Sequence, residues 1–153
     1  MEFNFCEQTV GGHFVPMKIS IIGAGRTRNG IGEYIGKYLH KNRARVTSVL
    51  GTTEKSSLQA SSALRKYGIE AHSYTTFNEM VRGEKPDAVV IASPSSTHYE
   101  YLLKSIDSGL HIFCEKPFLW DDHTDTRKRI EDIFEKARGK RLVIAMNSQW
   151  PFP

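Results

Sequence analysis

Short runs of apolar, often β-branched residues alternate with helical stripes along most of this sequence, and this alternation limits the fold more than any other feature. The first run, 15–22, stops at a Gly-Ala-Gly sequence, and Ile31, Ile35 and Leu39 then recur on one helical face. The pattern continues with strand-like runs at 46–50, 71–74, 88–92, 111–114 and 142–146, separated by helical stripes within 60–67, 77–81, 99–106 and 130–137. The sequence therefore predicts about six strands alternating with about five helices.

The order strand, helix, strand has a definite consequence for topology. Consecutive parallel strands need a crossover connection, and right-handed crossovers place helices on both faces of the sheet. The run 88–92 is continuously apolar, which is typical of a strand buried on both faces. We therefore expect an α/β fold of the Rossmann type, in which a doubly wound parallel sheet lies between two layers of helices.

A chain of 153 residues has the size of one such domain, and the pattern divides it unevenly. The α/β pattern occupies 17–150, which we interpret as one domain. Residues 1–16 precede it as an extension of unknown role, and a misassigned start, a cloning remnant and a genuine extension all fit the sequence. Residues 151–153 are interpreted as the start of a connection to another domain, since the length leaves no room for a separate substrate domain.

Charge and cysteine content argue against several classes of function. Lysine and arginine exceed aspartate and glutamate by 21 to 17, and the densest basic stretch, 127–129, is followed at once by Glu131 and Asp132. This is better explained by a solvated helix face than by nucleic-acid binding, which needs a one-sided basic patch. No apolar run is long enough to span a membrane. Cys6 and Cys114 form no metal or redox motif, so we expect no metal and a cytoplasmic location.

A Gly-x-Gly turn, Gly23 and Gly25, directly follows the first strand of the predicted sheet. Glycine allows the sharp turn into the helix, and a side chain at the second glycine would keep the backbone away from a pyrophosphate. The helix that follows then directs its free N–H groups at the phosphates. The usual third glycine falls at Arg28 and is missing, while Gly30 and Gly32 lie further on. A nucleotide site is favoured over the alternative of a tight turn without a ligand.

The end of the second strand indicates which nucleotide is bound. Binders of NAD usually carry an acidic residue there to bond the ribose 2′-hydroxyl, but here the nearest carboxylate is Glu54, in the expected helix start. The hydroxyls of Thr52 and Thr53 and the charge of Lys55 suit a 2′-phosphate, and Arg26 could pair with that phosphate or stack on the adenine. We therefore favour NADP over NAD. Either threonine could equally be only the N-cap of the second helix.

Two further stretches carry a family resemblance. The fourth strand runs into the Ala-Ser-Pro sequence at 92–94, with His98 shortly after it, and the fifth strand runs into the Glu-Lys-Pro sequence at 115–117. Together with the glycine turn, this ordered set resembles the Gfo/Idh/MocA family of oxidoreductases, over about 17–150. The resemblance implies an N-terminal Rossmann domain that binds NAD(P).

The resemblance also implies a set of cofactor contacts. Carried over residue by residue, they are Gly23, Gly25, Ser93, Pro94, His98, Glu115, Lys116 and Trp150. Ser93 and Pro94 would line the nicotinamide half with His98 close by, and Glu115 would face the nicotinamide ribose. Lys116 would be the catalytic residue, because it could donate to the substrate oxygen that changes oxidation state or relay its proton.

Each of these positions also has a simpler interpretation. Judged by themselves, Lys116 could be a surface lysine, His98 an N-terminal helix residue and Pro94 the end of a strand.

Trp150 belongs to the segment after the last strand, where family members contact the nicotinamide carboxamide. The family often has a cis peptide at the position of Pro117.

The expected function is that of the cofactor half of an oxidoreductase. Such an enzyme would transfer hydride between a nicotinamide cofactor and a sugar-like alcohol or aldehyde. Family members carry a catalytic histidine, within an Asp-x-x-x-His helix, in a second domain, for which this length leaves no room. That domain could be cut off from this chain or supplied by another chain, and a homo-oligomer is possible. The alternative is a stand-alone nucleotide-binding or sensor module without catalytic activity, and a methyltransferase that uses S-adenosylmethionine is a weaker third possibility.

Overall fold

The protein was analysed as a computed structural model that describes residues 7–10, 13–25, 31–120 and 125–147. Within these residues, six strands form one parallel sheet in the order β5-β4-β3-β6-β7-β8. The strands are β3 (Lys18–Ile22), β4 (Arg45–Leu50), β5 (His72–Tyr74), β6 (Ala88–Ile91), β7 (His111–Glu115) and β8 (Ile144–Asn147). The helices that connect them are α1 (Gly32–Lys41), α2 (Glu54–Arg65), α3 (Phe77–Glu84), α4 (His98–Asp107) and α5 (Thr126–Gly139), with a single 3₁₀ turn, η1 (Ser95–Thr97), before α4.

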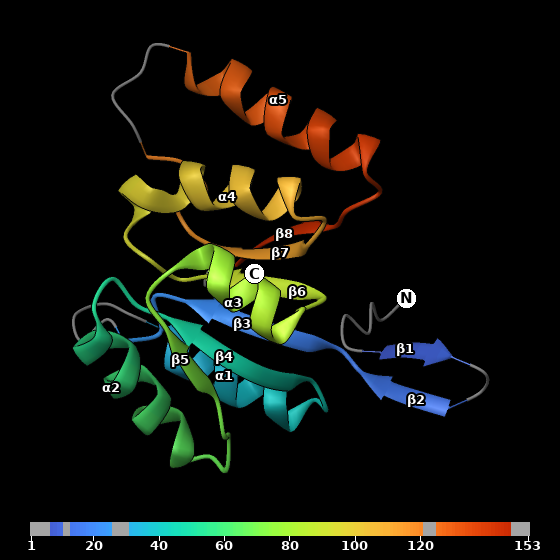
Figure 1. Cartoon of the computed structure of the whole chain (residues 1–153). Helices are drawn as coiled ribbons and strands as arrows, with labels where there is room; N and C mark the ends of the chain where they lie inside the picture. The colour runs from blue at the N-terminus through green and yellow to red at the C-terminus, as the bar shows by residue number, and fades with distance from the viewer. Residues whose placement is uncertain (1–6, 11–12, 26–30, 121–124, 148–153) are drawn as a thin grey trace, which may run out of the picture.

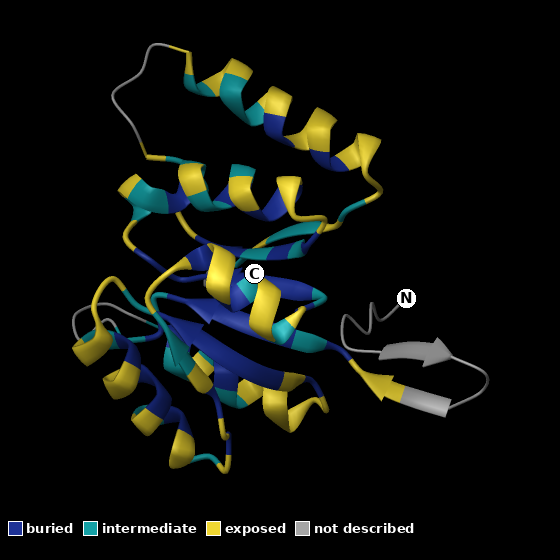
Figure 2. Ribbon diagram, viewed as in Figure 1, coloured by how far each residue is buried: buried dark blue, intermediate teal, exposed yellow. Residues whose placement is uncertain are grey.

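This topology confirms the doubly wound α/β fold that the sequence predicts. Helices α1 and α2 cover one face of the sheet, and α3, α4 and α5 cover the other (Figure 1). Two hydrophobic cores result, one on each face. Strand β6 contributes Ala88 and Val90 to the first core and Val89 and Ile91 to the second, which explains why its sequence is apolar throughout. Figure 2 shows the central strands buried along their length.

The N-terminal part of the chain differs from the sequence expectation. The apolar run 15–22 was expected as one strand, but the structure divides it between β2 (His13–Pro16) and β3. Strand β2 pairs with β1 (Glu7–Val10) in an antiparallel hairpin that forms a separate two-stranded sheet. Proline supplies no N–H to a sheet ladder, so Pro16 suits the end of β2. The hairpin projects away from the end of the main sheet (Figure 1).

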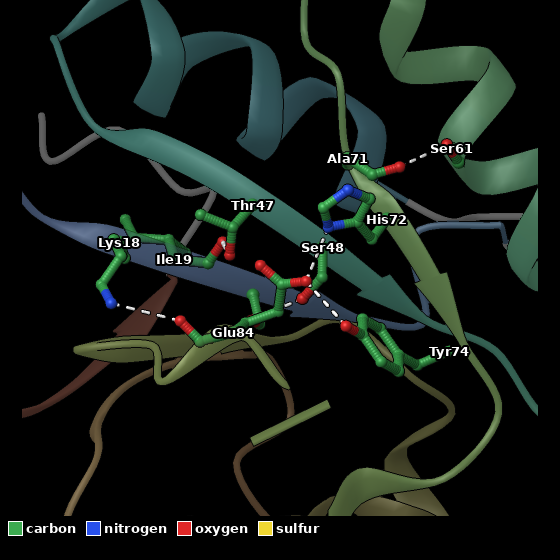
Figure 3. Close-up of polar contacts among 10 residues, drawn as sticks. Lys18, Ile19, Thr47, Ser48, Ser61, Ala71, His72, Tyr74 and Glu84 are labelled. Carbon is green, nitrogen blue, oxygen red and sulfur yellow. Dashed lines mark hydrogen bonds and ion pairs between the residues drawn. The ribbon is translucent and has the colours of Figure 1, made fainter. Parts of the chain in front are cut away.

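A polar cluster attaches the end of α3 to strands β4 and β5 (Figure 3). The Glu84 carboxylate accepts hydrogen bonds from the Tyr74 hydroxyl and the His72 Nδ1, each at 2.7 Å. Burial by itself would raise the pKa of Glu84, but these two hydrogen bonds, together with the charge of His72 and a hydrogen bond from Thr47, outweigh it and the pKa is lowered. The Glu84 hydrogen bond, with burial, raises the pKa of Tyr74. The backbone carbonyl of Tyr74 in turn accepts from the Gly51 N–H at 3.0 Å, so the cluster supports the loop after β4.

Two features are absent from the described residues. None of the helices there has the length and apolar character needed to cross a membrane. In the same part of the chain, no group of three or more His, Cys, Asp or Glu side chains is arranged to hold a metal ion.

Candidate cofactor-binding site

A cleft of about 430 Å³ opens at the carboxyl ends of β3, β4 and β6. Strand order reverses between β3 and β6, and this switch point is where open α/β sheets bind their ligands. The residues lining the cleft come from three connections between strands and helices, and they are Ile22, Gly23, Gly25, Leu50, Gly51, Thr52, Ser56, Ser93, Pro94, Thr97 and Tyr101. The structure therefore brings Gly23, Gly25, Thr52, Ser93 and Pro94 together, as the sequence predicts.

Gly23 is required by the way two loops meet at the switch point. Its φ of +84° lies in the left-handed region, and a Cβ built there would be 2.5 Å from the Cα of Ser93. Its N–H donates to the carbonyl of Leu50 at 3.0 Å, which fixes the turn against β4. Any larger residue would push the Ser93 loop away from β3. The glycine is thus explained by packing between loops as well as by ligand approach.

The third glycine that the motif lacks has a structural replacement. A Cβ at Gly32 would lie 2.9 Å from the Cα of Ala24 and 3.1 Å from the Cβ of Ala92, so α1 can pack on the strand ends only with glycine here. Close helix packing is the usual role of the third glycine. This role of Gly32 could not be inferred from the sequence, because the loop before Gly32 is longer than the standard loop. A Cβ at Gly25 would lie 2.7 Å from the Ser56 carbonyl oxygen.

Thr52 and Thr53, both in the connection from β4 to α2, have different roles in the structure, although the sequence analysis treated them alike. Thr53 is the N-cap of α2: its Oγ1 accepts from the Ser56 N–H at 3.2 Å, and the Ser56 Oγ accepts from the Thr53 N–H at 3.1 Å. Thr52 lines the cleft, whereas Thr53 does not. Lys55 is exposed in the first turn of α2, outside the lining residues. Arg26 lies outside the described residues.

Six lining residues were missed by the sequence analysis, and two of them, Thr97 and Tyr101, follow β6. Thr97 donates its hydroxyl either to the Ser93 Oγ or to the Pro94 carbonyl, both at 2.7 Å, and so fixes the loop after β6. Tyr101 is half-buried in the cleft wall, where burial chiefly raises its pKa. Tyr101 lies within the expected helical stripe 99–106, but the stripe alone did not indicate that this side chain would reach the cleft.

His98, which was expected near the nicotinamide half, is not among the residues that line the cleft. The side chain is 1% exposed, and its Nε2 lies 3.0 Å from the Ser93 carbonyl while its Nδ1 lies 2.9 Å from the Pro117 carbonyl. It therefore joins the loops after β6 and β7 from beneath. The Cys114 thiol lies 3.5 Å from Nδ1, and burial, reinforced by Glu115, raises its pKa to about 12, so Cys114 stays an unreactive thiol.

The Glu-Lys-Pro sequence ends β7, one strand further along the same edge of the sheet. Glu115 is 7% exposed, and the Asn147 Nδ2 donates to its Oε1 at 2.5 Å. Lys116 is exposed, and the peptide bond between Lys116 and Pro117 is cis, as the resemblance suggested. Glu115 and Lys116 stand outside the residues lining the cleft. Trp150 lies outside the described residues.

A glycine turn at the switch point of a doubly wound sheet, facing an open cleft, is the arrangement of a dinucleotide-binding α/β domain. Comparison with protein families agrees. Residues 17–148 match the family described as "Oxidoreductase family, NAD-binding Rossmann fold". The chain belongs to this family, the Gfo/Idh/MocA oxidoreductases.

Relatives with known names are similar over most of this chain. It is 31% identical to D-glucoside 3-dehydrogenase of Escherichia coli (strain K12), over 85% of this chain and 34% of that protein. It is 33% identical to inositol 2-dehydrogenase of Ralstonia nicotianae (strain ATCC BAA-1114 / GMI1000), over 83% of this chain and 35% of that protein. The chain thus spans about a third of the length of these relatives.

Solved structures share the fold at lower identity. GenD2 from gentamicin A biosynthesis, in complex with NAD, superposes with a TM-score of 0.72 at 20% identity, covering 92% of this chain and 37% of that one. Myo-inositol dehydrogenase from Lactobacillus casei, in complex with NAD(H) and myo-inositol, gives a TM-score of 0.68 at 24% identity, covering 86% of this chain and 36% of that one. These likenesses confirm the Rossmann-type fold.

Proposed function

We propose that this chain is the cofactor-binding part of an oxidoreductase that transfers hydride between a nicotinamide cofactor and a sugar-like alcohol or aldehyde. The observation that carries the proposal is the cleft at the switch point, with Glu115 and Lys116 at the end of the adjoining strand. The names of the relatives support the substrate class, because glucosides and inositol both present secondary alcohols on a six-membered ring.

The residues present fit a dinucleotide. Gly23 and Gly25 expose backbone in the cleft wall where a side chain would fill space, and α1 begins nearby at Gly32. The N-cap of α1, Ile31, makes no side-chain capping bond, so within the described residues this side chain does not compete with a phosphate for the first N–H groups of α1. The volume of the cleft, about 430 Å³, lies within the range of ligand sites.

Lys116 is the residue proposed to act on the substrate. Its exposed ammonium group follows directly on Glu115, at the carboxyl end of β7. When bound, the nicotinamide ring supplies the hydride acceptor or donor. The lysine would donate a hydrogen bond to the substrate oxygen and hold or pass on the proton that this oxygen loses or gains. Glu115 would accept from hydroxyls of the nicotinamide ribose.

We further propose a preference for NADP over NAD. No carboxylate is found among the lining residues of the cleft, and Thr52 stands where the ribose 2′-position is expected, with Lys55 in the next turn. Because the Thr53 hydroxyl is engaged in capping α2, the preference depends on Thr52 and Lys55. GenD2 was solved with NAD and the Lactobacillus casei dehydrogenase with NAD(H), so a preference for NADP would distinguish this chain from those two proteins.

Calorimetric titration of the chain with NADPH and NADH tests both statements. Dinucleotide binding is expected, with NADPH tighter. Thr52→Asp and Lys55→Asp should weaken NADPH by about tenfold and NADH much less, because each adds a negative charge near a 2′-phosphate. Lys128→Asp, an exposed position on α5, makes the same charge change as Lys55→Asp away from the cleft and should leave both affinities unchanged. Equal losses for both cofactors would refute the preference, and absence of binding at millimolar concentration would refute the function.

A further inference from the structure

Glu115 and Asn147 form a pair across the last two strands of the sheet. They are register partners at the carboxyl ends of β7 and β8. The Asn147 Nδ2 lies 2.5 Å from the Glu115 Oε1. Glu115 is 7% exposed, so its carboxylate is largely withdrawn from water and depends on protein donors. A carboxylate only accepts hydrogen bonds, which fixes the orientation of the amide with its nitrogen toward Glu115.

The pairing leaves the two carboxylate oxygens in different situations. Oε1 receives the Asn147 amide, and within the described residues no other donor reaches the Glu115 side chain. No buried side-chain oxygen of the described residues lacks a partner, so Oε2 must be accessible to solvent. One oxygen is therefore held by the protein, and the other is available to a ligand at the edge of the sheet where the cleft opens.

We propose that Asn147 is a positioning residue for cofactor binding, which acts through Glu115 and does not itself touch the cofactor. By holding Oε1, it orients Oε2 to accept from a ribose hydroxyl on the nicotinamide side. This inference rests on the proposed function, in which Glu115 faces that ribose. A neutral amide suits the task because it orients the carboxylate without neutralising its charge, as a lysine or arginine would. The sequence offered no signal for this role, which depends on the register between β7 and β8.

Two ligands separate positioning from general damage. NADPH and NADH contain the nicotinamide ribose, whereas ADP contains only the adenosine side of the dinucleotide. Asn147→Ala should weaken binding of the preferred dinucleotide by about tenfold and leave ADP binding unchanged, because a hydrogen bond to a charged group is lost at one end of the ligand only. Asn147→Asp at pH 8 should weaken it further, since two carboxylates would then face each other. Met146→Ala, at the exposed neighbouring position of β8, should change neither affinity.

A double-mutant cycle then tests the route through Glu115. Glu115→Ala with Asn147→Ala should bind the dinucleotide no more weakly than Glu115→Ala alone, because the amide has nothing left to orient. Additive losses would overturn the inference, and so would an unchanged affinity for Asn147→Ala. A parallel loss of ADP binding with a lowered melting temperature would also overturn it, by showing a merely structural role.

Two further outcomes keep the inference testable. Should Asn147→Ala fail to fold, the nearly isosteric Asn147→Asp carries the same comparison between dinucleotide and ADP. If the unaltered chain binds ADP and the dinucleotide but Asn147 variants behave like the parent, only the inference fails. If the unaltered chain binds no dinucleotide, the proposed function fails and the inference with it.

Discussion

The two sides of the cleft keep their shape by different means. On β3 and β4, the glycine side, the wall is made by Gly23, Gly25 and Gly51, and a Cβ built at any of the three would come within 2.7 Å of a neighbouring backbone atom or side chain. On β6, β7 and β8, the side-chain side, His98 joins two loops and Asn147 holds Glu115. The first side depends on the absence of side chains, and the second on hydrogen bonds that side chains make.

This difference has a consequence for what a substitution can do. On the glycine side, an added methyl group collides with backbone, so the expected damage is loss of stability and of the whole cleft. On the side-chain side, removal of one polar group leaves its partners unpaired while the fold can persist. A substitution on the glycine side should therefore reduce both stability and ligand binding. A substitution on the side-chain side should be able to weaken ligand binding while the fold persists.

The largest effect is expected for Gly23→Ala. The left-handed φ costs about 1–2 kcal/mol for a residue with a Cβ, and the collision with Ser93 adds about 1–3 kcal/mol. Gly68→Ala is the matched control, because Gly68 also has a positive φ, +74°, but nothing lies within 4 Å of its built Cβ. Urea unfolding should show a loss of about 4 kcal/mol for the first and about 1 kcal/mol for the second. Equal losses would show that strain alone, and not the contact between loops, makes Gly23 necessary.

His98→Ala comes next and tests the side-chain side. It removes a buried ring that contacts the Ser93 and Pro117 carbonyls, so a loss of about 3 kcal/mol is expected in urea unfolding. Because the glycine side stays intact, ADP should still bind while the dinucleotide weakens. His40→Ala, at an exposed histidine of α1, should leave stability and binding as they are. An equal weakening of ADP would show that the two sides are not independent.

Glu84→Gln tests the support beneath the glycine side through its pH dependence. The pKa of Glu84 is lowered in the folded state, so its stabilisation is present at neutral pH and is lost as the pH falls through that lowered value. The variant should be about 1.5 kcal/mol less stable at pH 7, and the gap should narrow below pH 4.5, the ordinary value for the group. Glu100→Gln, which breaks only the exposed pair with Lys104, should show almost no gap in unfolding curves at either pH.

The smallest effect is expected for Thr53→Ala. It removes the N-cap of α2 and should cost about 1 kcal/mol in thermal or urea unfolding. Thr52→Ala, one residue earlier, removes no capping bond and should be nearly neutral for stability while affecting cofactor choice. A larger cost at Thr52 than at Thr53 would reverse the assignment of the two threonines.

The sequence predicted the fold because its periodicity reports burial directly. Continuous apolar residues in β6 reflect two cores, and the stripe of α4 reflects one. It placed the start of the domain at residue 17, next to the break between β2 and β3, but still took 15–22 as one strand, because nothing in the sequence indicated that residues 15–16 belong to a separate sheet. It also left the hairpin of β1 and β2 without structure, because neither strand contributes to the alternation.

The site was predicted less completely, for two physical reasons. Motifs identify residues near the ligand, but they do not distinguish residues that line the cleft from residues that hold its loops in place. His98 was therefore expected to contact the cofactor, although it is buried and is not among the residues lining the cleft. Contacts between distant elements are also invisible in sequence. Gly32 serves the packing role of the missing glycine, and Asn147 meets Glu115, only because the strands align in a particular order.

The strand order also divides the chain into two consecutive pieces. Strands β3, β4 and β5 come from residues 18–74, and β6, β7 and β8 come from 88–147, with α3 between them. The cleft takes its walls from both pieces, so a bound dinucleotide would bridge them as a non-covalent crosslink. If the chain were cut within 85–87, the reassembly of its two fragments should therefore depend on ligand concentration. The fraction of reassembled protein would then measure how much of the cleft is occupied by ligand.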